Sequence, residues 1–394
     1  MRAARFHAAG DIRIEDIPPP QPSDDKVLVD VEWCGICGSD LNEFIFGPFA
    51  IPSARKGPHP LTNALLPVTM GHEFTGRISH VPEAFASSTE RTRQPLRKGQ
   101  AVVIDPRFYC SSCTPCTQSA TNSCEKLGFM GISGGGGGLS DVVAVSPEQI
   151  HVLPERTSEN GGVDSGDGPD LAAAALVEPL AVAWHAVRLF FSISAAQFGS
   201  GSEKVNLRDV PVLVVGAGPL GVAMVFVLRA RGAQTIFVSE VSKARREMLR
   251  EAGIVTETLD PAQDNVAKRC KEVTGSGVGV VFDCAGSQAG FQAGCESLRV
   301  RGVFVNLAAP KMPITLPFGP FMWKEIMYKC SLAYDQGDFK DTLDAFVSGH
   351  FRGVEKMITR RIALEDIVEQ GFKKLVKPND HIKILATPKQ ANIR

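Results

Sequence analysis

The stretch Val212-Leu-Val-Val-Gly216-Ala-Gly218-Pro-Leu-Gly221 decides the fold that this sequence predicts. It places the spacing GxGxxG directly after an apolar run typical of a buried strand, and the segment Leu220 to Arg231 that follows is typical of a helix. Glycines at these positions let the backbone approach a pyrophosphate, and the first turn of a helix offers free N–H groups and a positive dipole end. A tight turn without a ligand is the alternative. The sequence therefore predicts a dinucleotide site made by Gly216, Gly218, Pro219, Leu220 and Gly221.

Glu240 indicates which dinucleotide this turn would hold. It closes the next strand-like run, Thr235 to Val238. A carboxylate there accepts hydrogen bonds from the adenosine ribose hydroxyls and repels a 2′-phosphate. Lys243, Arg245 and Arg246 follow closely, and they either soften that repulsion or form a solvated helix face. The sequence predicts NAD rather than NADP as the cofactor, with Glu240 and Arg245 among its contacts.

The residues around this turn continue as strands and helices in alternation. Apolar runs recur at Val278 to Phe282 and Gly302 to Val305, and helical segments such as Lys243 to Ala252 lie between the strands. This alternation predicts a doubly wound parallel sheet. Before about residue 153 the chain has short strands separated by Pro and Gly turns, such as Val27 to Val31 and Ala101 to Ile104. The sequence therefore predicts an α/β protein in which a β-rich domain precedes a parallel-sheet domain.

Composition limits the partners that can be expected. The 394 residues suffice for two domains, and 42 Lys and Arg nearly balance 43 Asp and Glu, so nucleic acid is not an expected partner. The uncharged stretch Val210 to Leu228 approaches the length of a membrane span, but Pro211, Pro219 and its glycines match a strand–turn–helix joint. Because no apolar signal segment follows Met1, we expect a cytoplasmic protein without a membrane span.

Four of the ten cysteines lie in one short segment, Cys110-x2-Cys113-x2-Cys116-x7-Cys124. Four thiolates at this spacing can close a tetrahedron around Zn²⁺ and leave no open position, as in structural zinc sites. An iron–sulfur cluster takes the same ligand type, but nothing else in the sequence suggests electron transfer. Without a signal peptide, so many cysteines argue against a disulfide framework. The sequence predicts a structural zinc bound by Cys110, Cys113, Cys116 and Cys124.

A second, more dispersed set of possible ligands lies in the β-rich half. Cys37, within Cys34-Gly-Ile-Cys37-Gly-Ser39-Asp40, and the pair His72-Glu73 offer a thiolate, an imidazole and a carboxylate. Three protein ligands plus water would make a catalytic zinc site with one position open to substrate. The alternative is that no metal binds: Cys37 would be a buried thiol, His72 a core histidine whose ring nitrogens are hydrogen-bonded, and Glu73 a surface acid. The spacing alone leaves both interpretations open.

Two further segments have more than one interpretation. Glu178-Pro179 opens the apolar run Leu180 to Val187, which suits a helix with Pro179 at its first position. Glu178 is then either an acid at the positive end of a helix dipole or a carboxylate at an interdomain active site. Gly134 to Gly138 lacks the Lys-Ser/Thr pair of a phosphate loop, so we expect a flexible turn before the strand at Val142.

These residues together resemble the zinc-containing medium-chain dehydrogenase/reductase superfamily, which includes the alcohol dehydrogenases. The motifs follow that superfamily's order, and the match runs over nearly the whole chain, to His381-Ile-Lys-Ile-Leu385. The (R,R)-butanediol dehydrogenase branch, close to the sorbitol dehydrogenases, is similar in further segments. These are Gly47 to Pro52, His59 to Thr62, Leu66 to Glu73, Gly134 to Ser140, Val177 to His185 and Val238 to Glu240.

The resemblance implies both a fold and a set of roles. It implies a GroES-like catalytic domain at residues 1–185 with a zinc lobe near 105–126, a Rossmann NAD-binding domain at 186–340, and a segment 341–394 that returns to the catalytic domain. The catalytic zinc would be held by Cys37, His72 and Glu73, with Glu178 at the metal or one water away. Ser39 would accept the proton of the substrate hydroxyl. A homo-oligomer, dimer or tetramer, is also implied.

Asn42 departs from this pattern. Many relatives carry a histidine there that continues the proton relay to solvent, and a neutral amide cannot carry a proton in its place. Either Glu43, His59 or a water chain then substitutes for it, or turnover is slow. The candidate catalytic residues are therefore Ser39, Glu43 and Glu178.

The resemblance implies zinc-dependent hydride transfer between NAD and a small secondary alcohol or vicinal diol, with 2,3-butanediol and acetoin as the expected kind of pair. A dehydrogenase of sorbitol-like polyols or of other secondary alcohols is the alternative. A non-catalytic NAD-binding protein that keeps this fold is the rival from another class. The joint presence of Cys37, Ser39, His72 and Glu73 argues against that rival.

Overall fold

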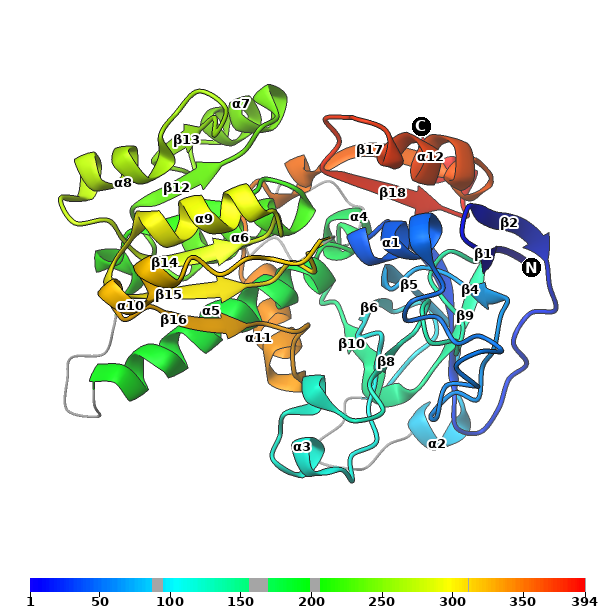
Figure 1. Cartoon of the computed structure of the whole chain (residues 1–394). Coiled ribbons are helices and arrows are strands. Elements are labelled where there is room, and N and C mark those ends of the chain that lie inside the picture. The colour runs from blue at the N-terminus through cyan, green and yellow to red at the C-terminus, as the bar shows by residue number, and fades with distance from the viewer. Residues whose placement is uncertain (87–94, 156–168, 199–205, 311, 394) are drawn as a thin grey trace. The chain divides into compact units, whose positions relative to one another are not determined.

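The computed structural model describes the chain except for residues 87–94, 156–168, 199–205, 311 and 394. The described residues divide into two compact units (Figure 1). One unit combines Met1–Glu178 with Ile358–Arg394, and the other is the continuous segment Pro179–Met357. The second unit is therefore inserted into the first. The functional domain limits expected at residues 185 and 340 stay a prediction.

The first unit is mostly β-structure. Its helices are short: α1 (Gly38–Phe46), α2 (Glu83–Ala86), α3 (Thr114–Thr117), α4 (Leu171–Ala174) and α12 (Lys373–Val376). Its strands are β1 (Arg2–Ala8), β2 (Asp11–Asp16), β3 (Val27–Gly35), β4 (Val68–Thr69), β5 (Glu73–His80), β6 (Ala101–Ile104), β7 (Arg107–Phe108), β8 (Gly128–Phe129), β9 (Val142–Val145), β10 (Ile150–Val152), β17 (Ile358–Ala363) and β18 (Lys383–Thr387).

The largest sheet of this unit has the strand order β10-β6-β5-β3-β18-β17, and β9 also pairs with β3. Two smaller sheets, β2-β1-β4 and β7-β8, accompany it. Because β3 lies in the middle of the large sheet, nearly all of its residues are buried. Val29, Phe74 and Ile384, from β3, β5 and β18, belong to one apolar core. These three strands thus each contribute buried side chains to the same core.

The register of this sheet gathers residues that are far apart in the sequence. β18 pairs antiparallel with β3, with Leu385 opposite Gly35. On the other side of β3, Gly35 lies opposite Glu73, the first residue of β5. Lys383, the first residue of β18, therefore comes close to Glu73 at the end of β3. The candidate metal site is built at this point.

The second unit contains a six-stranded sheet of order β13-β12-β11-β14-β15-β16, and every strand pair in it is parallel. This is the order of a doubly wound dinucleotide-binding sheet. Its strands are β11 (Val212–Val215), β12 (Ile236–Ser239), β13 (Glu257–Leu259), β14 (Val278–Asp283), β15 (Leu298–Asn306) and β16 (Met327–Cys330). Its helices are α5 (Val177–Phe198), which begins at the unit boundary, α6 (Pro219–Ala230), α7 (Lys243–Glu251), α8 (Val266–Thr274), α9 (Gln288–Ser297), α10 (Phe318–Lys324) and α11 (Gln336–Val347).

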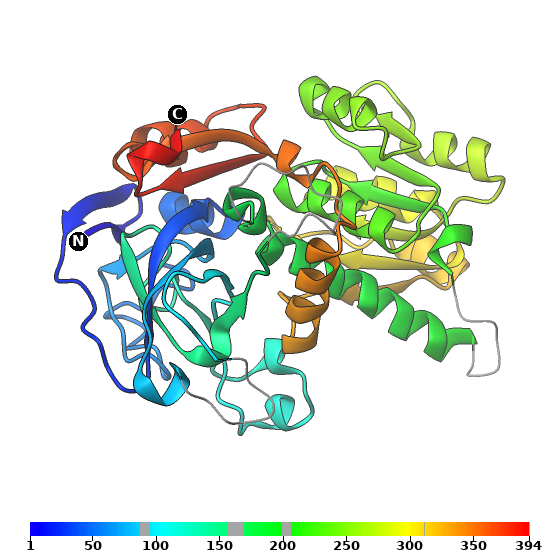
Figure 2. The ribbon, with the colours of Figure 1, turned by 180° about the vertical axis from the view of Figure 1, so that it is seen from behind.

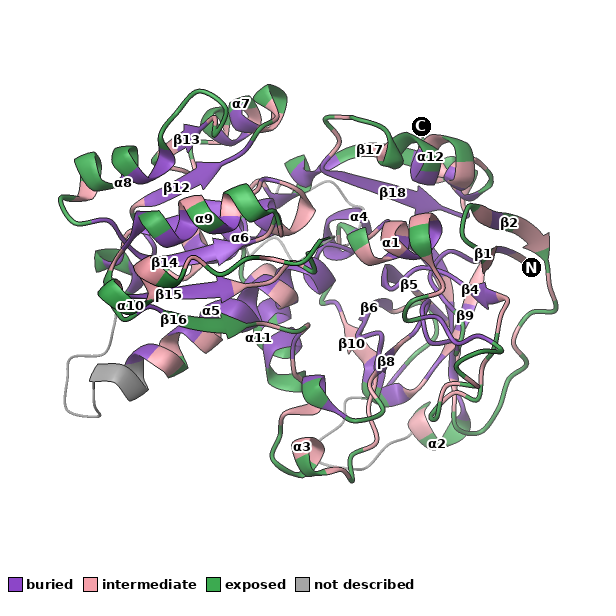
Figure 3. Cartoon of the chain, in the orientation of Figure 1, coloured by how far each residue is buried: buried purple, intermediate pink, exposed green. Residues whose placement is uncertain are grey.

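Helices cover both faces of this parallel sheet. Within the unit, α8 and α9 lie in front of the strands in Figure 1, whereas α5 and α6 lie on the side seen in Figure 2. The residues of β11, β12 and β14 are all buried, as expected for parallel strands that are covered on both sides. Figure 3 shows this buried centre, and it also shows that β16 at the sheet edge is exposed. The predicted parallel sheet is confirmed.

The uncharged stretch noted in the sequence consists of β11, the glycine turn and α6. Val222 to Leu228 of α6 are all buried, which explains why the helix is apolar on every side. Among the described residues, no helix is both long enough and apolar enough to cross a membrane. The strand–turn–helix interpretation of this stretch is therefore confirmed.

Helix α5 starts earlier than the sequence indicates. It begins at Val177 rather than at Pro179, so Pro179 is its third residue and not its first. The structure accommodates this proline because the first four N–H groups of a helix have no partner within the helix. Glu178 consequently lies inside the first turn, and its side chain is 4% exposed.

Candidate functional site

Cys37, His72 and Glu73 meet at the ends of two neighbouring strands. Cys37 follows β3 and is the N-cap residue of α1, whereas His72 and Glu73 stand where β5 begins. The antiparallel pairing of Gly35 with Glu73 sets these two points side by side. One thiol, one imidazole and one carboxylate atom from the three residues all lie within 4.8 Å of one another. The structure thus brings together the dispersed ligand set predicted from the sequence.

Asp40 orients the His72 ring. One oxygen of the buried Asp40 carboxylate lies 3.3 Å from Nδ1 of His72, and the other accepts a hydrogen bond from the backbone N–H of Cys37. Nε2 of His72 lies 3.2 Å from Oγ of Ser39. Burial lowers the pKa of His72, but the charges of Asp40 and Cys37 outweigh it and hold the pKa well above its usual value. A carboxylate behind one ring nitrogen is the arrangement that presents the other nitrogen to a metal.

Glu73 is held by an ion pair within the core. Its two carboxylate oxygens lie 2.7 and 2.6 Å from Nζ of Lys383, which also donates to the backbone carbonyl of Ile36. Both side chains are almost fully buried. Burial lowers the pKa of Lys383, and the charges of Glu73 and Cys37 more than compensate, so the pKa lies above its usual value. Lys383 therefore competes with any metal for the Glu73 carboxylate.

Gly35 leaves room for this carboxylate. A Cβ atom at Gly35 would lie 2.1 Å from Oε2 of Glu73. Any side chain at this position would consequently displace Glu73 from both Lys383 and the ligand group. The donor set of sulfur, imidazole nitrogen and carboxylate oxygen fits zinc, which accepts all three.

Cys110, Cys113, Cys116 and Cys124 form the second ligand group, with their sulfur atoms within 4.8 Å of one another. Backbone N–H groups of Cys110 and Lys126 both donate to Sγ of Cys124. Donation by the backbone and hydroxyl of Ser112 lowers the pKa of Cys110 to about 5, whereas burial and the nearby Cys113 raise the pKa of Cys116 to about 12. All ten cysteines are free thiols. Four sulfur atoms without a bridge fit a closed zinc site.

The glycine turn of the second unit has the geometry that a dinucleotide needs. Gly216 has φ = 91°, and a Cβ atom at Gly221 would lie 1.9 Å from the backbone oxygen of Gly216. Gly218 is the N-cap of α6, Pro219 is its first residue, and no atom lies within 4 Å of where a Cβ atom of Gly218 would stand. The turn is therefore tightly closed at its two ends and open at its middle glycine, where a pyrophosphate would approach the helix N-terminus.

Glu240 is tied to this turn. One of its carboxylate oxygens accepts a hydrogen bond from the backbone N–H of Ala217, and the other accepts one from Ser242 at 2.8 Å. The Arg246 guanidinium donates to the backbone carbonyl of Glu240 and pairs with Asp260. Arg245 lies in the first turn of α7, where its N–H donates to Oγ of Ser242. Glu240 thus directly follows β12, the second strand, and lies beside the glycine turn.

Comparison with known proteins identifies relatives of both units. Residues 219–348 match the family described as zinc-binding dehydrogenase, and residues 23–155 match the alcohol dehydrogenase GroES-like domain. The (R,R)-butanediol dehydrogenase of Bacillus subtilis is 36% identical over 98% of this chain and 100% of the relative. That of Saccharomyces cerevisiae is 33% identical over 98% of each chain. The chain belongs to the zinc-binding dehydrogenase family.

Solved structures of zinc-binding dehydrogenases confirm the predicted fold class. The crystal structure of 2R,3R-butanediol dehydrogenase from Bacillus subtilis has a TM-score of 0.81 at 34% identity and covers 98% of this chain and 99% of its own. A homologue from Sinorhizobium meliloti, solved with NADP bound, has a TM-score of 0.78 at 25% identity and covers 98% and 99%. The α/β architecture of a GroES-like domain with a parallel-sheet domain is that of the zinc-binding dehydrogenases.

The three candidate catalytic residues of this zinc-binding dehydrogenase occupy different settings. Ser39 lies beside the ligand group, next to His72. Glu43 is 3% exposed, and its carboxylate accepts hydrogen bonds from the backbone N–H groups of Phe49 and Ala50. Glu178 is buried and contributes to raising the pKa of Lys383, but it is not a member of the three-residue ligand group. The structure therefore places Ser39 beside His72, does not include Glu178 in the ligand group, and places Glu43 in contact with the loop at Phe49 and Ala50.

Sequence reasoning missed two residues of the site. Asp40 was detectable, because an acid three residues after an N-cap position is the signature of a capping box. Lys383 was not, because its partner Glu73 is 310 positions away. Only the register of β18 against β3 brings the two together.

Proposed function

We propose that this chain is a zinc-dependent, NAD-linked dehydrogenase that interconverts a vicinal diol or small secondary alcohol with the corresponding ketone, 2,3-butanediol and acetoin being the expected kind of pair. The observation that carries the proposal is the meeting of Cys37, His72 and Glu73 within 4.8 Å. Relatives named (R,R)-butanediol dehydrogenase, which match nearly the full length of the chain, support the substrate class. The reaction moves a hydride from the carbinol carbon to NAD⁺ and releases the hydroxyl proton.

The roles of the residues follow from their contacts. Zinc bound by Cys37, His72 and Glu73 would lower the pKa of a substrate hydroxyl or polarise a carbonyl. Ser39, whose Oγ lies 3.2 Å from the His72 ring, is placed to receive the hydroxyl proton and pass it on. Asp40 keeps Nε2 of His72 directed toward Cys37 and Ser39. Lys383 would pair with the Glu73 carboxylate whenever that carboxylate is not bound to the metal. Glu178, whose charge acts on Lys383, is proposed as a further carboxylate that binds the metal or its water.

Coenzyme choice is proposed from Glu240. Its carboxylate is held at the glycine turn by two backbone N–H groups, which presents it to the ribose and disfavours a 2′-phosphate. Arg245 is proposed as an additional contact. A cytoplasmic location and assembly into a dimer or tetramer also remain proposals from the sequence.

A substrate and coenzyme panel tests this function. Initial rates should be highest with 2,3-butanediol stereoisomers or acetoin and with NAD⁺ or NADH. Higher rates with sorbitol or xylitol would favour the polyol alternative, which the D-xylulose reductase A of Aspergillus oryzae, 28% identical over 95% of this chain, represents. Failure of a protein with two bound zinc ions to oxidise any alcohol in the panel would favour the non-catalytic alternative.

A further inference from the structure

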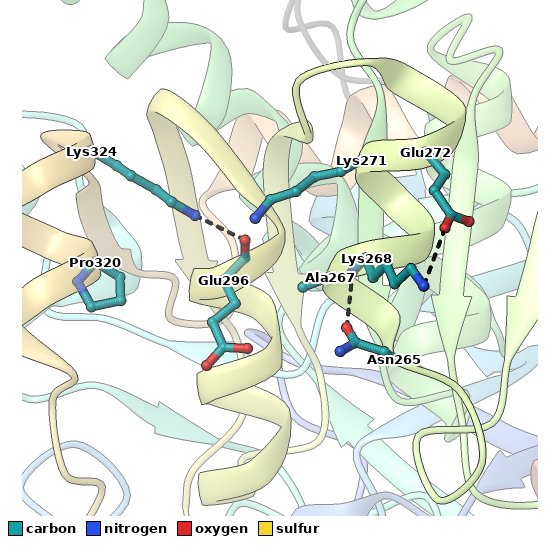
Figure 4. A pocket seen from close by; sticks show the side chains of 8 residues that line it. All are labelled: Asn265, Ala267, Lys268, Lys271, Glu272, Glu296, Pro320 and Lys324. Carbon is teal, nitrogen blue, oxygen red and sulfur yellow. Dashed lines mark hydrogen bonds and ion pairs between the residues drawn. The ribbon is translucent and has the colours of Figure 1, made fainter.

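Two of the cavities in the described part of the second unit are lined by several cationic side chains. The larger, of about 690 Å³, lies between α8, α9 and α10 (Figure 4). Two of the three lysines that line it have partners: Lys268 pairs with Glu272, and Nζ of Lys324 donates to the backbone carbonyl of Glu296. The side chains of both glutamates also line this cavity. The larger cavity therefore contains its own counter-charges.

The smaller cavity, here called the basic pocket, has a volume of about 510 Å³ and differs in its charge. Its ionisable lining residues are Arg229, His350 and Arg352, and no described acid lines it. Phe226 and Ile254 add apolar surface to the lining. Because the whole chain has a formal charge of -1, this excess of bases is local and is not a property of the surface at large. A cavity bordered by bases alone favours the binding of an anion.

Arg229, in the last turn of α6, is fixed in place by backbone carbonyls. Its Nε donates to the carbonyl of Ile254 at 2.6 Å, and its Nη1 donates to those of Ala233 and Gln234 at 2.8 and 3.0 Å. Its Nη2 donates to no group among the described residues. Burial lowers the pKa of Arg229, and no described carboxylate opposes this shift. The guanidinium is therefore partly desolvated without a described counter-ion, and its Nη2 donors remain available to a ligand.

His350 and Arg352 line the pocket from the segment that follows α11. Both are exposed, and neither side chain forms an ion pair or hydrogen bond with any residue that the structure describes. A guanidinium carries five N–H donors, and an imidazole offers at least one in either protonation state. Exposed cations often lack a partner, but these two share a cavity with the partly buried Arg229. Like charges gathered in this way repel one another unless an anion lies between them.

The basic pocket lies away from the glycine turn of its own unit. The glycine turn follows β11, at the edge of the sheet where the parallel strands end. Gln234 and Ile254, whose carbonyls bind Arg229, precede β12 and β13 and so lie at the opposite edge, where the strands begin. A doubly wound parallel sheet binds its dinucleotide at the edge where the strands end. An anion in the basic pocket would therefore be a ligand in addition to the dinucleotide.

We infer that the basic pocket binds a phosphate dianion, either free or as the monoester group of a small metabolite, between Arg229, His350 and Arg352. The fork of a guanidinium matches two oxygens of a phosphate. Donors from three separate residues need an acceptor with oxygens in several directions, which a tetrahedral phosphate offers and a planar carboxylate does not. Because Arg229 belongs to α6 and Arg352 follows α11, the bound anion would join these two elements. The inference is independent of the proposed reaction.

The test is the binding of inorganic phosphate to the zinc-loaded protein, followed by phosphorus NMR. Saturation with NADH keeps phosphate out of the glycine turn. The wild-type protein should bind phosphate with a dissociation constant of about 1 mM or below, as expected of several charge-assisted hydrogen bonds. Acetate and chloride at the same ionic strength should not displace it. Competition by glycerol 3-phosphate would assign the site to a monoester, and its absence would assign the site to free phosphate.

Variants of the exposed Arg352 locate the site. Arg352→Gln should weaken phosphate binding by about tenfold or more, because it removes a guanidinium fork from the pocket. Arg352→Lys keeps the charge without the fork and should weaken binding less. Lys271→Gln, which removes a cation from the larger cavity, is the matched control and should leave the dissociation constant within about twofold. Saturating phosphate should raise the unfolding temperature of the wild type and not that of Arg352→Gln.

Several outcomes would overturn the inference. These are no phosphate binding by the wild type, equal affinity of the wild type and Arg352→Gln, and displacement of phosphate by acetate or chloride, which would indicate an ordinary counter-ion. Loss of binding in Lys271→Gln but not in Arg352→Gln would place the anion in the larger cavity. Vesicles of phosphatidic acid that bind the wild type and not Arg352→Gln, without any binding of soluble phosphate, would show that the pocket contacts lipid instead.

Discussion

At the scale of single residues, the Glu73 carboxylate has two possible cationic partners, a metal ion and the Lys383 ammonium group. It is one of three potential metal ligands, and at the same time it forms a buried ion pair with Lys383. A buried charge is stable only when it is paired, so the carboxylate must always have a cation beside it. Lys383 supplies that cation in the absence of a metal. The ion pair with Lys383 therefore keeps the Glu73 carboxylate in place beside Cys37 and His72. Two predictions concern the residues of this group.

Replacement of Lys383 by methionine should destabilise the metal-free protein. The Glu73 carboxylate would be left buried without a partner, and loss of one member of a buried pair costs about 3–5 kcal/mol. Urea unfolding after zinc has been removed with a chelator measures the effect. Lys383→Arg is the control, since it keeps a cation, and the double variant Lys383→Met with Glu73→Leu should recover most of the loss. Equal unfolding midpoints for Lys383→Met and the wild type would contradict the assigned pair.

Replacement of Cys37 by alanine should remove one zinc ion and nearly all turnover. The metal supplies several kcal/mol of transition-state stabilisation, so kcat should fall by on the order of a thousandfold or more. NADH affinity, measured by fluorescence titration, should stay within about twofold, because the glycine turn belongs to the other unit. Metal analysis should find one zinc per chain instead of two. Substantial activity in this variant would disprove a substrate held by zinc.

At the scale of elements, charged residues join α5 to α11 within the second unit. Nδ1 of His185 lies 2.6 Å from Asp338, and the guanidinium of Arg188 contacts Asp338 at 2.9 Å and also Asp335. Asp335 is the N-cap of α11 and accepts hydrogen bonds from the N–H groups of Gly337 and Asp338. Arg188 lies where a cation would otherwise bind the His185, Asp335 and Asp338 group. The guanidinium therefore takes the role of the cation in this cluster.

Arg188→Met should lower stability in a pH-dependent manner. Burial opposes ionisation of Asp335, but its hydrogen bond and charge interaction with Arg188 prevail and hold the pKa of Asp335 below its usual value. A carboxyl group whose pKa is lower in the folded state stabilises the fold above its unfolded-state pKa, and this contribution disappears as the pH falls through the folded-state pKa. We expect a loss of about 1–3 kcal/mol at pH 7, since buried acceptors lose a donor, and a smaller difference below about pH 4.

Urea unfolding at pH 7, 5 and 3.5 measures this prediction. Lys340→Met, which breaks the exposed pair with Asp344 on the same helix, is the control and should cost less than about 0.5 kcal/mol. A difference between Arg188→Met and the wild type that is constant across this pH range would show that the charge of Asp335 does not matter.

The elements show how far local sequence carries a prediction. The sequence placed strands at Val27, Ala101, Val142, Val212 and Val278 and helices at Leu220 to Arg231 and Lys243 to Ala252, and the structure has an element at each of these places. The glycine run is different. A turn occurs there, but Gly137 packs against the backbone of Thr69 and Met70, and Gly138 packs against Phe74, so the run is a packed turn and not a flexible one. Glycine predicts backbone freedom, while tertiary contacts decide whether that freedom is used.

At the scale of the whole molecule, local motifs predicted the chemistry of each part and not the connections between parts. The four cysteines lie within one short segment, and the glycine turn within another, so each ligand set could be recognised from its spacing. The pairing of β18 with β3, and with it Lys383, depends on contacts between the two ends of the chain. The meeting of Arg229 and Arg352 at one cavity depends on which loops the fold brings to the same edge of the sheet. Neither property is encoded in a short window of sequence.

The four-cysteine lobe should contribute stability rather than catalysis. Cys124→Ser should reduce the zinc content from two ions per chain to one and lower the unfolding free energy by several kcal/mol, because binding of a structural zinc is coupled to folding. Calorimetry and metal analysis measure both effects. kcat at a temperature well below unfolding should remain within a few-fold of wild type. A variant that keeps two zinc ions, or that keeps its thermal stability, would contradict a closed metal site at these cysteines.

The place of β18 has a consequence for biosynthesis. A ribosome delivers β18 after every other strand described here, so nascent β3 lacks its neighbour, and Glu73 lacks its ammonium partner, until translation reaches Lys383. The contiguous segment Pro179–Met357 faces no such delay. During synthesis the segment Pro179–Met357 can therefore fold before the first unit is complete. The first unit, although its N-terminal part is made earlier, stays incompletely folded and accessible to proteases and chaperones for longer.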